Sequence, residues 1–337
     1  MKLKSIINYS LSLGLTLLFM YLAFRGKDMG QLWASVSNVS LGWFVLLTVG
    51  GTISHLIRAW RWQYILYPIK PDVSLRNSFS AVMIGYLVNN VLPRVGEVVR
   101  PVAIGKLEKI SRSAAFGTVI LERLIDLITF VFFLLLVLLL YAASFAKLFP
   151  GVANIEWVFL AIAVASLAAF VFIFLKAELV FSLVRRAIVV LPEAIRKKAE
   201  RIVDSFLTGF GASKHSGNFL MIAVTSLMIW GLYIVLMYIP FFPFGLIGVY
   251  GLDFSSATIL MVVSGIAFAV PTPSGFGSYH LLMAMVLSKL FDVDPVVAAG
   301  YTLYTHSLGF ISTTIVGLYY LAVDKIHVVE IVSEPGV

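Results

Sequence analysis

Residues 127–141 read LITFVFFLLLVLLLY and carry no charged side chain. They continue a helical apolar pattern that begins near residue 116, so the whole stretch is long enough to cross ~30 Å of hydrocarbon at ~1.5 Å per residue. Strands of an outer-membrane barrel would instead show ~10-residue segments of alternating polarity. The stretch therefore predicts an α-helical membrane protein.

The composition of the whole chain supports this prediction. Of its 337 residues, 60% are hydrophobic and only 12% are charged, whereas soluble domains average roughly 45–50% and about 25%. This nearly excludes a soluble globular protein, a disordered chain and a coiled coil. The absence of cysteine excludes disulfides, thiol nucleophiles and cysteine-based metal sites.

Apolar runs along the chain predict an all-α polytopic membrane protein with about six spanning helices and two re-entrant helical hairpins. The shorter runs come in two pairs, each interrupted by proline and glycine, which is why they indicate hairpins rather than full spans. The predicted spans are residues 6–24, 41–62, 116–141, 156–175, 219–239 and 295–323, and the hairpin pairs are 78–92 with 98–105 and 256–270 with 279–291.

The distribution of basic residues predicts the topology of this single membrane domain, residues 1–337. With a cytoplasmic N-terminus, 20 of the 25 lysines and arginines fall on the cytoplasmic side, as the positive-inside rule requires. This favours a multi-pass protein of the cytoplasmic (inner) membrane. The net charge of +8 then reflects orientation and anionic headgroups, and no nucleic-acid partner is expected.

The same topology suggests an inverted repeat. Residues 1–141 and residues 156–323 each show the order span, span, hairpin, span. Because each unit crosses the membrane three times, the second unit has the opposite orientation to the first. Paired broken helices in corresponding halves point to a transport site near the middle of the membrane. The connecting region, residues 142–218, holds a span and a basic amphipathic stretch, which is typical of a helix on the membrane surface or of a solvated linker helix.

The first hairpin contains the strongest cluster of polar residues, NNVLPRVGEVVRP at residues 89–101. Proline and glycine break the helix there and leave backbone groups unpaired, which the two asparagines are suited to satisfy. The arginines offer guanidinium groups that match phosphate geometry, although a cytoplasmic loop that touches lipid headgroups is an alternative. The candidate substrate-binding residues of this hairpin are Asn89, Asn90, Arg94, Glu97 and Arg100.

Three further candidates, Glu122, Arg123 and Asp126, lie at the start of the predicted span that contains the opening stretch. Charges in a span are expensive unless they are paired or face a polar cavity. Glu122 and Asp126 are four residues apart and share a helix face, and Arg123 can pair with Asp126 or with Glu97 across the hairpin. The cluster predicts either a structural lock or a switch coupled to a ligand.

The second hairpin breaks at VPTPSGFGSYH, residues 270–280. Two prolines and two glycines forbid a continuous helix, and the helix that restarts near Ser278 offers N–H groups that favour an anion. His280 can titrate near neutral pH or serve as a hydrogen-bonded structural group. The candidates in this hairpin are Ser274, Gly275, Gly277 and His280.

The second predicted span ends in RAWRW, residues 58–62. Arginine and tryptophan at the end of a span are ordinary interfacial anchors. Arg58 and Arg61 also share a helix face, which makes them candidates for binding a headgroup. No spacing indicates a metal site, a nucleotide loop or an activated nucleophile, so no metal, cofactor or catalytic residue is predicted.

At these four motifs the chain resembles the transmembrane region of lysylphosphatidylglycerol synthase, a flippase-like family of integral membrane proteins. The resemblance covers nearly the whole chain and implies a membrane domain that binds or moves lipids. It implies no enzyme, because the soluble domain that loads lysine onto phosphatidylglycerol in the fused synthases is expected to be absent. The family loop commonly reads Pro-x-Pro-Gly-Gly-x-Gly followed by a glutamate, whereas Ser274 and His280 stand near two of these positions.

Three functions are compatible with these features. We favour a flippase that moves the headgroup of an anionic phospholipid, or of a polyprenyl or terpenoid phosphate, with Arg94, Arg100 and Arg123 holding the phosphate. The second function is a membrane-embedded lipid transferase with a carboxylate or His280 as base. The third is a non-catalytic membrane partner of a lipid synthase or glycosyltransferase. A homo-oligomer is compatible with each.

Overall fold

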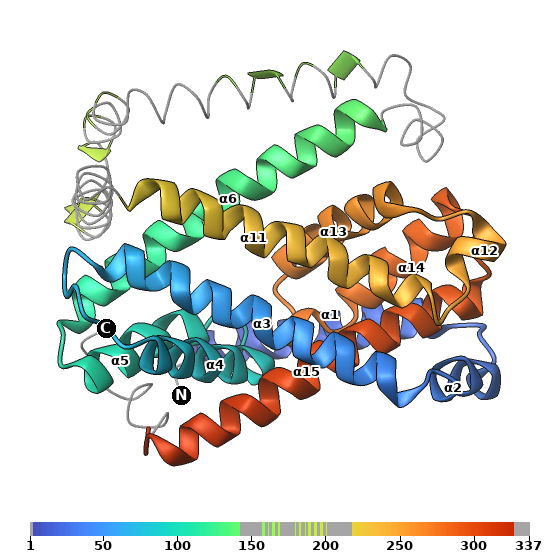
Figure 1. Cartoon of the computed structure of the whole chain (residues 1–337), viewed down its shortest axis with the longest axis horizontal. Helices are drawn as coiled ribbons and strands as arrows, with labels where there is room; N and C mark the ends of the chain where they lie inside the picture. Colours follow the sequence, from blue (N-terminus) through green and yellow to red (C-terminus); the bar gives the residue numbers. More distant parts are fainter. Residues whose placement is uncertain are drawn as a thin grey trace.

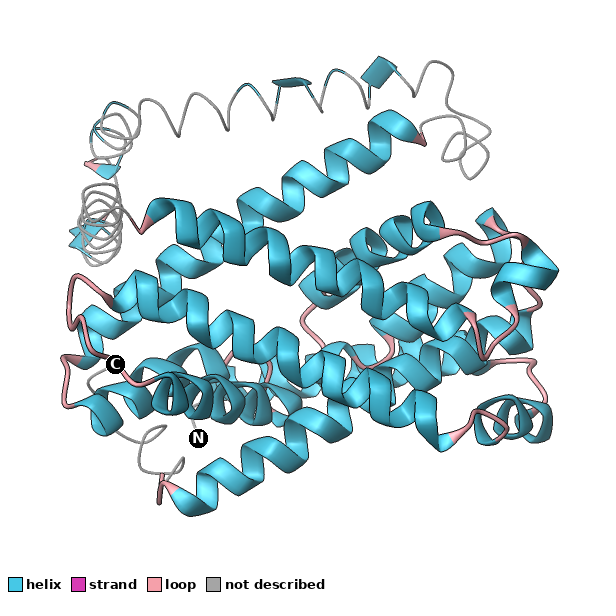
Figure 2. Ribbon diagram, viewed as in Figure 1, coloured by secondary structure: helices cyan, strands magenta, loops and turns pink. Residues whose placement is uncertain are grey.

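The structure is a computed structural model that describes residues 3–141 and 218–326, together with scattered positions between residues 157 and 200. In this described part the chain forms helices joined by short loops and contains no β-strand, so the predicted all-α fold is confirmed (Figure 2). The first group of helices is α1 (Leu3–Phe24), α2 (Met29–Ser37), α3 (Leu41–Leu66), α4 (Leu75–Val91), α5 (Gly96–Glu108) and α6 (Arg112–Leu140). The second is α11 (Phe219–Tyr238), η1 (Ile239–Phe241), α12 (Leu246–Tyr250), α13 (Phe254–Ala269), η2 (Pro273–Gly275), α14 (Ser278–Leu290) and α15 (Pro295–Val323).

Three of these helical segments are long and apolar enough to cross a membrane. They are α3, α11 together with η1, and α15. The shorter apolar helices include α13 and the part of α1 from Ser10 to Phe24. The predicted span at 156–175 and the predicted surface helix, both in the connecting region 142–218, lie outside the described residues except for scattered positions.

Proline and glycine set the helix boundaries much as the sequence predicts. α4 ends at Val91, just before Pro93, and α13 ends at Ala269, just before Pro271. One expectation is wrong: the charges around Glu122 do not begin a helix. α6 begins ten residues earlier, at Arg112, so these charges lie inside a helix that already has its first turns.

Two short helices, α2 and α12, were not predicted. α2 begins after Asp28, whose Oδ1 accepts hydrogen bonds from the backbone N–H groups of Gly30 and Gln31 at 2.7 and 3.1 Å. Such an N-cap stabilises even a short helix, because it satisfies donors that have no partner within the helix. The aspartate was a local signal for α2, but the nine residues are too few for an apolar period to show.

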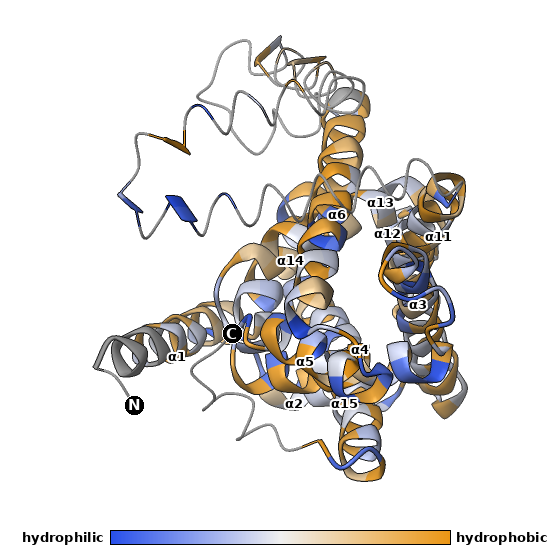
Figure 3. Ribbon diagram, turned by 90° about the vertical axis from the view of Figure 1, so that its left-hand side faces the viewer, coloured by the Kyte–Doolittle hydropathy of each residue, from blue (hydrophilic) through white to orange (hydrophobic). Residues whose placement is uncertain are grey.

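The bundle is apolar outside and charged inside. The ribbons of α6 and α11 carry mostly the colour of hydrophobic residues (Figure 3). Large apolar side chains are exposed on the outer helices, and examples are Leu17, Leu46, Leu127, Leu220 and Ile315. Buried polar side chains include histidine and also arginine and glutamate, which soluble proteins almost never bury fully unless they are paired. This distribution is the one expected of helices surrounded by lipid.

The packing brings segments that are far apart in the sequence side by side. α3 lies along α11, and α4 packs against both α5 and α15 (Figure 1). α4 and α5 come together at two glycines, because a Cβ atom on Gly96 would collide with the carbonyl oxygen of Gly85 and would lie 2.7 Å from Asn89 Oδ1. The first hairpin can therefore close only with glycine at residue 96.

At the far end of α5, Glu108 fastens the hairpin to the loop that precedes α4. Its carboxylate accepts hydrogen bonds from Lys70 Nζ at 2.6 Å, the backbone N–H of Ser74 at 3.0 Å and Asn77 Nδ2 at 2.7 Å. Burial alone would raise the pKa of Glu108, but the hydrogen bonds from Lys70, Asn77 and Ser74 outweigh it and lower the pKa below its ordinary value.

This shift predicts a pH dependence of folding. Because the pKa of Glu108 is lower in the folded state, its contribution is present above the ordinary value of 4.5 and is lost as the pH falls through the folded pKa. We expect Glu108→Gln to melt at a lower temperature at neutral pH and to lose less further stability than the parent when the pH falls below 4.5. Thermal melts in detergent across this range measure both effects.

The control is Asp72→Asn, which removes an exposed carboxylate from the same loop. We expect this variant to keep the parent's pH dependence. A Glu108→Gln chain that lost as much stability as the parent at acid pH would contradict the assignment.

Candidate functional site

A network of ion pairs lies where α3 and α6 meet. Arg58 Nη1 lies 2.6 Å from Glu122 Oε1 and 2.7 Å from Asp126 Oδ2. Arg61 Nη2 lies 3.2 Å from Glu122 Oε1 and 2.7 Å from Asp126 Oδ1. The spacings of three and four residues put each pair on one helix face. Two arginines of α3 are thereby bound to two carboxylates of α6.

α11 completes the surroundings of the same two arginines. Arg58 Nη2 donates to the hydroxyl of Tyr233 at 3.2 Å, and Arg61 Nη1 donates to the hydroxyl of Ser226 at 3.0 Å. Both arginine side chains are at most 5% exposed. They are therefore neither interfacial anchors nor open to a headgroup in this arrangement, because the face that they share meets carboxylates instead of lipid.

Glu122 lies at the centre of the network. Its buried carboxylate is within ion-pair distance of two more arginines, Arg100 at 2.7 Å and Arg123 at 3.2 Å. A single carboxylate thus serves four guanidinium groups, which come from α3, α5 and α6. We call the whole set the arginine cluster; it consists of Arg58, Arg61, Arg100, Arg123, Glu97, Glu122 and Asp126.

The arginine cluster holds four arginines and three carboxylates, so one positive charge is in excess. Arg100 is 5% exposed and its guanidinium lies 3.8 Å from the centroid of the Trp62 ring. Arg123 is 40% exposed, and its ion pairs with Asp126 and Glu97 are long, at 3.4 and 3.6 Å. Arg123 is therefore the arginine of the cluster that is most accessible and least tightly paired.

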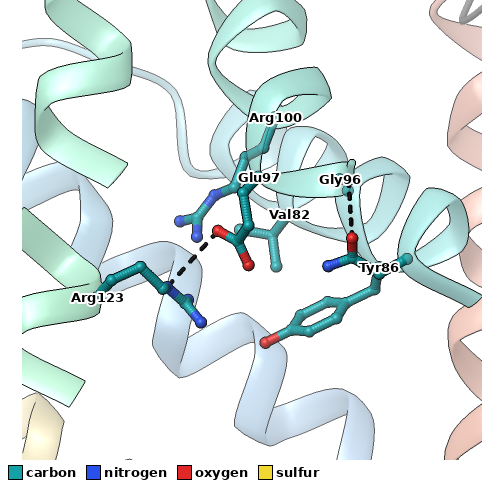
Figure 4. A pocket seen from close by; sticks show the side chains of 8 residues that line it. Val82, Tyr86, Gly96, Glu97, Arg100 and Arg123 are labelled. Carbon is teal, nitrogen blue, oxygen red and sulfur yellow. Dashed lines mark hydrogen bonds and ion pairs between the residues drawn. The ribbon is translucent and has the colours of Figure 1, made fainter. Parts of the chain in front are cut away.

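A pocket opens beside Arg123, between α4, α5 and α6. Glu97 faces Arg123 across it, and the ring of Tyr86 lies along its edge (Figure 4). Its space is about 210 Å³ when the open mouth is included, but the part enclosed by protein is only about 10 Å³, roughly the room of one water molecule. The pocket is therefore a narrow polar recess and not an enclosed ligand cavity in this arrangement. Its polar lining consists of Tyr86, Asn89, Glu97, Arg100 and Arg123.

The two asparagines of the first break have different partners. Asn89 Oδ1 accepts a hydrogen bond from the backbone N–H of Gly96 at 2.7 Å, which is the backbone role predicted for it. Asn90 does not bind its own break. Its Nδ2 donates to the hydroxyls of Thr313 and Thr314 at 3.0 and 2.9 Å, so it joins α4 to α15.

The two helix breaks meet. Ser274 Oγ donates to Asn90 Oδ1 at 2.9 Å, and Arg94 Nη2 donates to the carbonyl oxygen of Ala269 at 3.1 Å. Arg94 and Ser274 both have positive φ angles, of 66° and 49°, which bulky side chains adopt only in tight turns. Arg94 is exposed and does not line the pocket, so the structure separates it from Arg100 and Arg123.

The remaining candidates of the second hairpin are packed against other helices. A Cβ atom on Gly277 would lie 2.7 Å from the carbonyl oxygen of Thr16, so α1 occupies the space beside this glycine. Gly275 is similarly close to the ring of Phe268. His280 is fully buried and does not line the pocket. In the part of the chain that the structure describes, no group of three metal-ligating side chains is found.

Three residues of the site were not predicted. Tyr86 lies three residues before Asn89, one helical turn away on α4, and this spacing was a signal that could have identified it. Ser226 and Tyr233 lie seven residues apart on one face of an apolar helix. Nothing near them in the sequence marks them as partners of arginines on α3.

The sequence was compared with known families and proteins. The model of the lysylphosphatidylglycerol synthase transmembrane region matches residues 9–317. The chain belongs to this family. Since the match covers the arginine cluster and both helix breaks, all of these features lie within the family's membrane region.

The names of two relatives say only that they are membrane proteins. A UPF0104 membrane protein of Methanocaldococcus jannaschii is 26% identical over 302 residues, which cover 86% of either chain. A UPF0104 membrane protein of Methanothermobacter thermautotrophicus is 28% identical over 272 residues, or 74% of this chain and 76% of the relative. No solved structure matches the chain.

The geometry of the arginine cluster predicts that replacing its two glutamates lowers the free energy of unfolding by different amounts. Glu122→Gln leaves buried arginines without their shared partner, and we expect a loss of about 3–5 kcal/mol, as for other broken buried ion pairs. Glu97→Gln is the matched control, because Glu97 is 31% exposed and pairs only at 3.6 Å, and we expect ~0–1 kcal/mol. Denaturant titration in detergent micelles measures both, and equal losses would contradict a central role for Glu122.

Proposed function

We propose that the protein is a lipid flippase, or lipid-binding translocator, that moves a phosphate-containing headgroup across the cytoplasmic membrane. The observation that carries this proposal is Arg123, a part-exposed guanidinium that lines a pocket at a helix break. A phosphate would neutralise the excess positive charge of the arginine cluster, and guanidinium groups match phosphate oxygens in geometry. The apolar outer surface of the bundle leaves the lipid tails in the bilayer.

The binding step is an exchange of ion-pair partners at Arg123, from carboxylates of the protein to the phosphate of the lipid. Before the headgroup binds, the long ion pairs of Arg123 with Asp126 and Glu97 hold the guanidinium in place. A phosphate oxygen takes over these contacts, and Glu97 receives the guanidinium again when the phosphate leaves. Arg100 stays paired with Glu122 and adds its positive charge to the field in the pocket. Binding of this kind is moderate, which a translocator needs in order to release its lipid.

The proposal also places the pocket in the membrane. On this proposal α4 with α5, and α13 with α14, are two re-entrant hairpins among about six spans. One hairpin lies in each of the inverted repeats 1–141 and 156–323, and the two hairpins enter the membrane from opposite sides. The direct contact between the two breaks supports this arrangement. A cytoplasmic N-terminus is supported by the 20 of 25 basic residues that then lie on the cytoplasmic side.

On this proposal the protein breaks no covalent bond and needs no cofactor. Its partners are membrane lipids: an anionic phospholipid, or a polyprenyl or terpenoid phosphate. The shared chemistry is a phosphate group on an apolar anchor, which the pocket and the outer surface recognise separately. A covalently altered lipid among the products of the purified protein would instead support a transferase.

The test is headgroup transfer in phosphatidylcholine vesicles that contain fluorescent NBD-labelled phosphatidylglycerol and the purified protein. Dithionite bleaches the label only in the outer leaflet, so transfer appears as a slow further loss of fluorescence. We expect Arg123→Gln to slow this loss roughly tenfold or more, because a charge-assisted hydrogen bond to phosphate contributes ~1.5–3 kcal/mol.

Lys289→Gln is the matched control, because it removes one exposed basic charge outside the pocket. We expect it to transfer lipid at the parent's rate. Equal rates for Arg123→Gln and the parent, with both proteins folded, would refute the assignment of the pocket.

A further inference from the structure

A second cluster of titratable side chains lies beside the second helix break, outside the arginine cluster. His280 in the first turn of α14 and His306 in the middle of α15 have ring centroids 4.7 Å apart. His280 is fully buried and His306 is 5% exposed. The rings that contact the two imidazoles belong to Phe24, Phe268, Phe276 and Tyr279.

Most nitrogens of this pair have no hydrogen-bond partner. His306 Nε2 lies 2.8 Å from the carbonyl oxygen of Ser274, and because a carbonyl only accepts, neutral His306 carries its proton on Nε2. Its Nδ1 is then a buried acceptor without a partner, and both ring nitrogens of His280 lack partners too. Each buried unsatisfied group costs roughly 1–3 kcal/mol, so a role that needs free lone pairs is indicated.

The charged and titratable groups that the structure describes near the pair are a tyrosine and basic residues. Tyr279 is the titratable neighbour on α14, and its hydroxyl is bonded to Thr305 at 3.0 Å. Arg94, from the turn between α4 and α5, is bound to the end of α13, so the charge at the junction of the breaks is positive. Just after the end of α1, two basic residues are engaged elsewhere: Arg25 lies over the ring of Tyr21, and Lys27 donates to the carbonyl oxygen of Ala23.

No carboxylate of the described residues forms an ion pair with either histidine. The closely packed arrangement therefore accommodates the neutral imidazoles only, because an uncompensated buried charge is costly. The faces of the surrounding rings attract a cation too weakly to replace water around it.

We propose that His280 and His306 form a buried proton-binding site, and that a proton taken up there separates the second helix break from α15 and α4. His306 holds the break through the carbonyl of Ser274, and the hydroxyl of the same serine holds Asn90 of the first break. A positive charge on either ring is stabilised once water reaches it, which requires the break to move away. The site thus couples a proton to the junction at which the two breaks meet.

The direction and size of the pH response follow from this linkage. The packed state takes neutral rings and the separated state takes protonated ones, so acid favours separation. For each proton taken up, the ratio of separated to packed molecules rises up to tenfold per pH unit below the ordinary imidazole pKa of about 6.5. One proton therefore gives about a 30-fold change between pH 7.5 and pH 5.0, of which about 16-fold falls below pH 6.5, and little change above pH 7.5.

The experiment measures the distance between α14 and α15 directly. The chain has no cysteine, so Met285→Cys and Ile315→Cys introduce two unique sites for nitroxide labels. Both side chains are exposed, by 45% and 62%. We expect double electron–electron resonance to show one distance population at pH 7.5 and a second population at pH 5.0, since the label itself does not respond to pH in this range.

Three variants locate the response. His280→Asn cannot take up a proton, and His306→Gln cannot either, but the glutamine amide can still donate to the carbonyl of Ser274. We expect each to weaken the acid-induced population and the double variant to lose it. His55→Asn is the matched control: His55 lies on α3 with its ring 4.5 Å from that of Tyr86, and this variant should respond like the parent.

Identical distance distributions at pH 5.0 and 7.5 in the labelled parent would overturn the proposal, whether or not the variants fold. A response that persists in His280→Asn with His306→Gln, or that disappears in His55→Asn, would overturn it as well. The measurement requires no lipid transfer. It can therefore fail while the flippase assignment holds, and succeed while that assignment fails.

Discussion

A single carboxylate, Glu122, fixes the relative positions of three helices. Arginine side chains in the interior of an apolar bundle have no bulk water to solvate them, so each must find negative charge or polar groups within the protein. Glu122 lies within 3.2 Å of all four arginines of the cluster. Ion pairs of this kind add little net stability compared with apolar packing, but removing one partner is costly. The cluster therefore specifies which arrangement of α3, α5 and α6 is formed.

Other contacts follow from that arrangement. With α3 fixed against α6, the face of α11 that meets α3 offers acceptors to further guanidinium protons: Tyr233 accepts from Arg58 Nη2 and Ser226 accepts from Arg61 Nη1. With α5 fixed by Arg100, α4 must approach α5 closely, and Gly96 allows this approach. The pocket beside Arg123 is the place where the network reaches the surface, and the excess positive charge is accessible there.

The sequence predicts local features well and long-range partners poorly. Proline and glycine end helices through their own backbone geometry, so α4, α5, α13 and α14 lie within a few residues of their predicted bounds. That Arg58 and Arg61 share a helix face could also be read from their spacing. That this face meets Glu122, more than 60 residues away, could not, because an arginine at the end of a span looks the same whether it meets lipid or a carboxylate. α2 and α12 are too short for periodicity to reveal them.

The arginine cluster and the junction of the two helix breaks differ in how much free energy is needed to pull their helices apart. Breaking a buried ion pair of the arginine cluster costs about 3–5 kcal/mol because a charge is left without a partner. The hydrogen bonds at the junction of the breaks, between Asn90 and Ser274 and between Arg94 and Ala269, contribute roughly 0.5–3 kcal/mol each. A movement that exposes the centre of the bundle therefore separates the breaks first and leaves α3, α5 and α6 together. Arg94, which is exposed and holds α13 by a single hydrogen bond, is released by that movement, whereas Arg58 and Arg61 stay bound to their carboxylates.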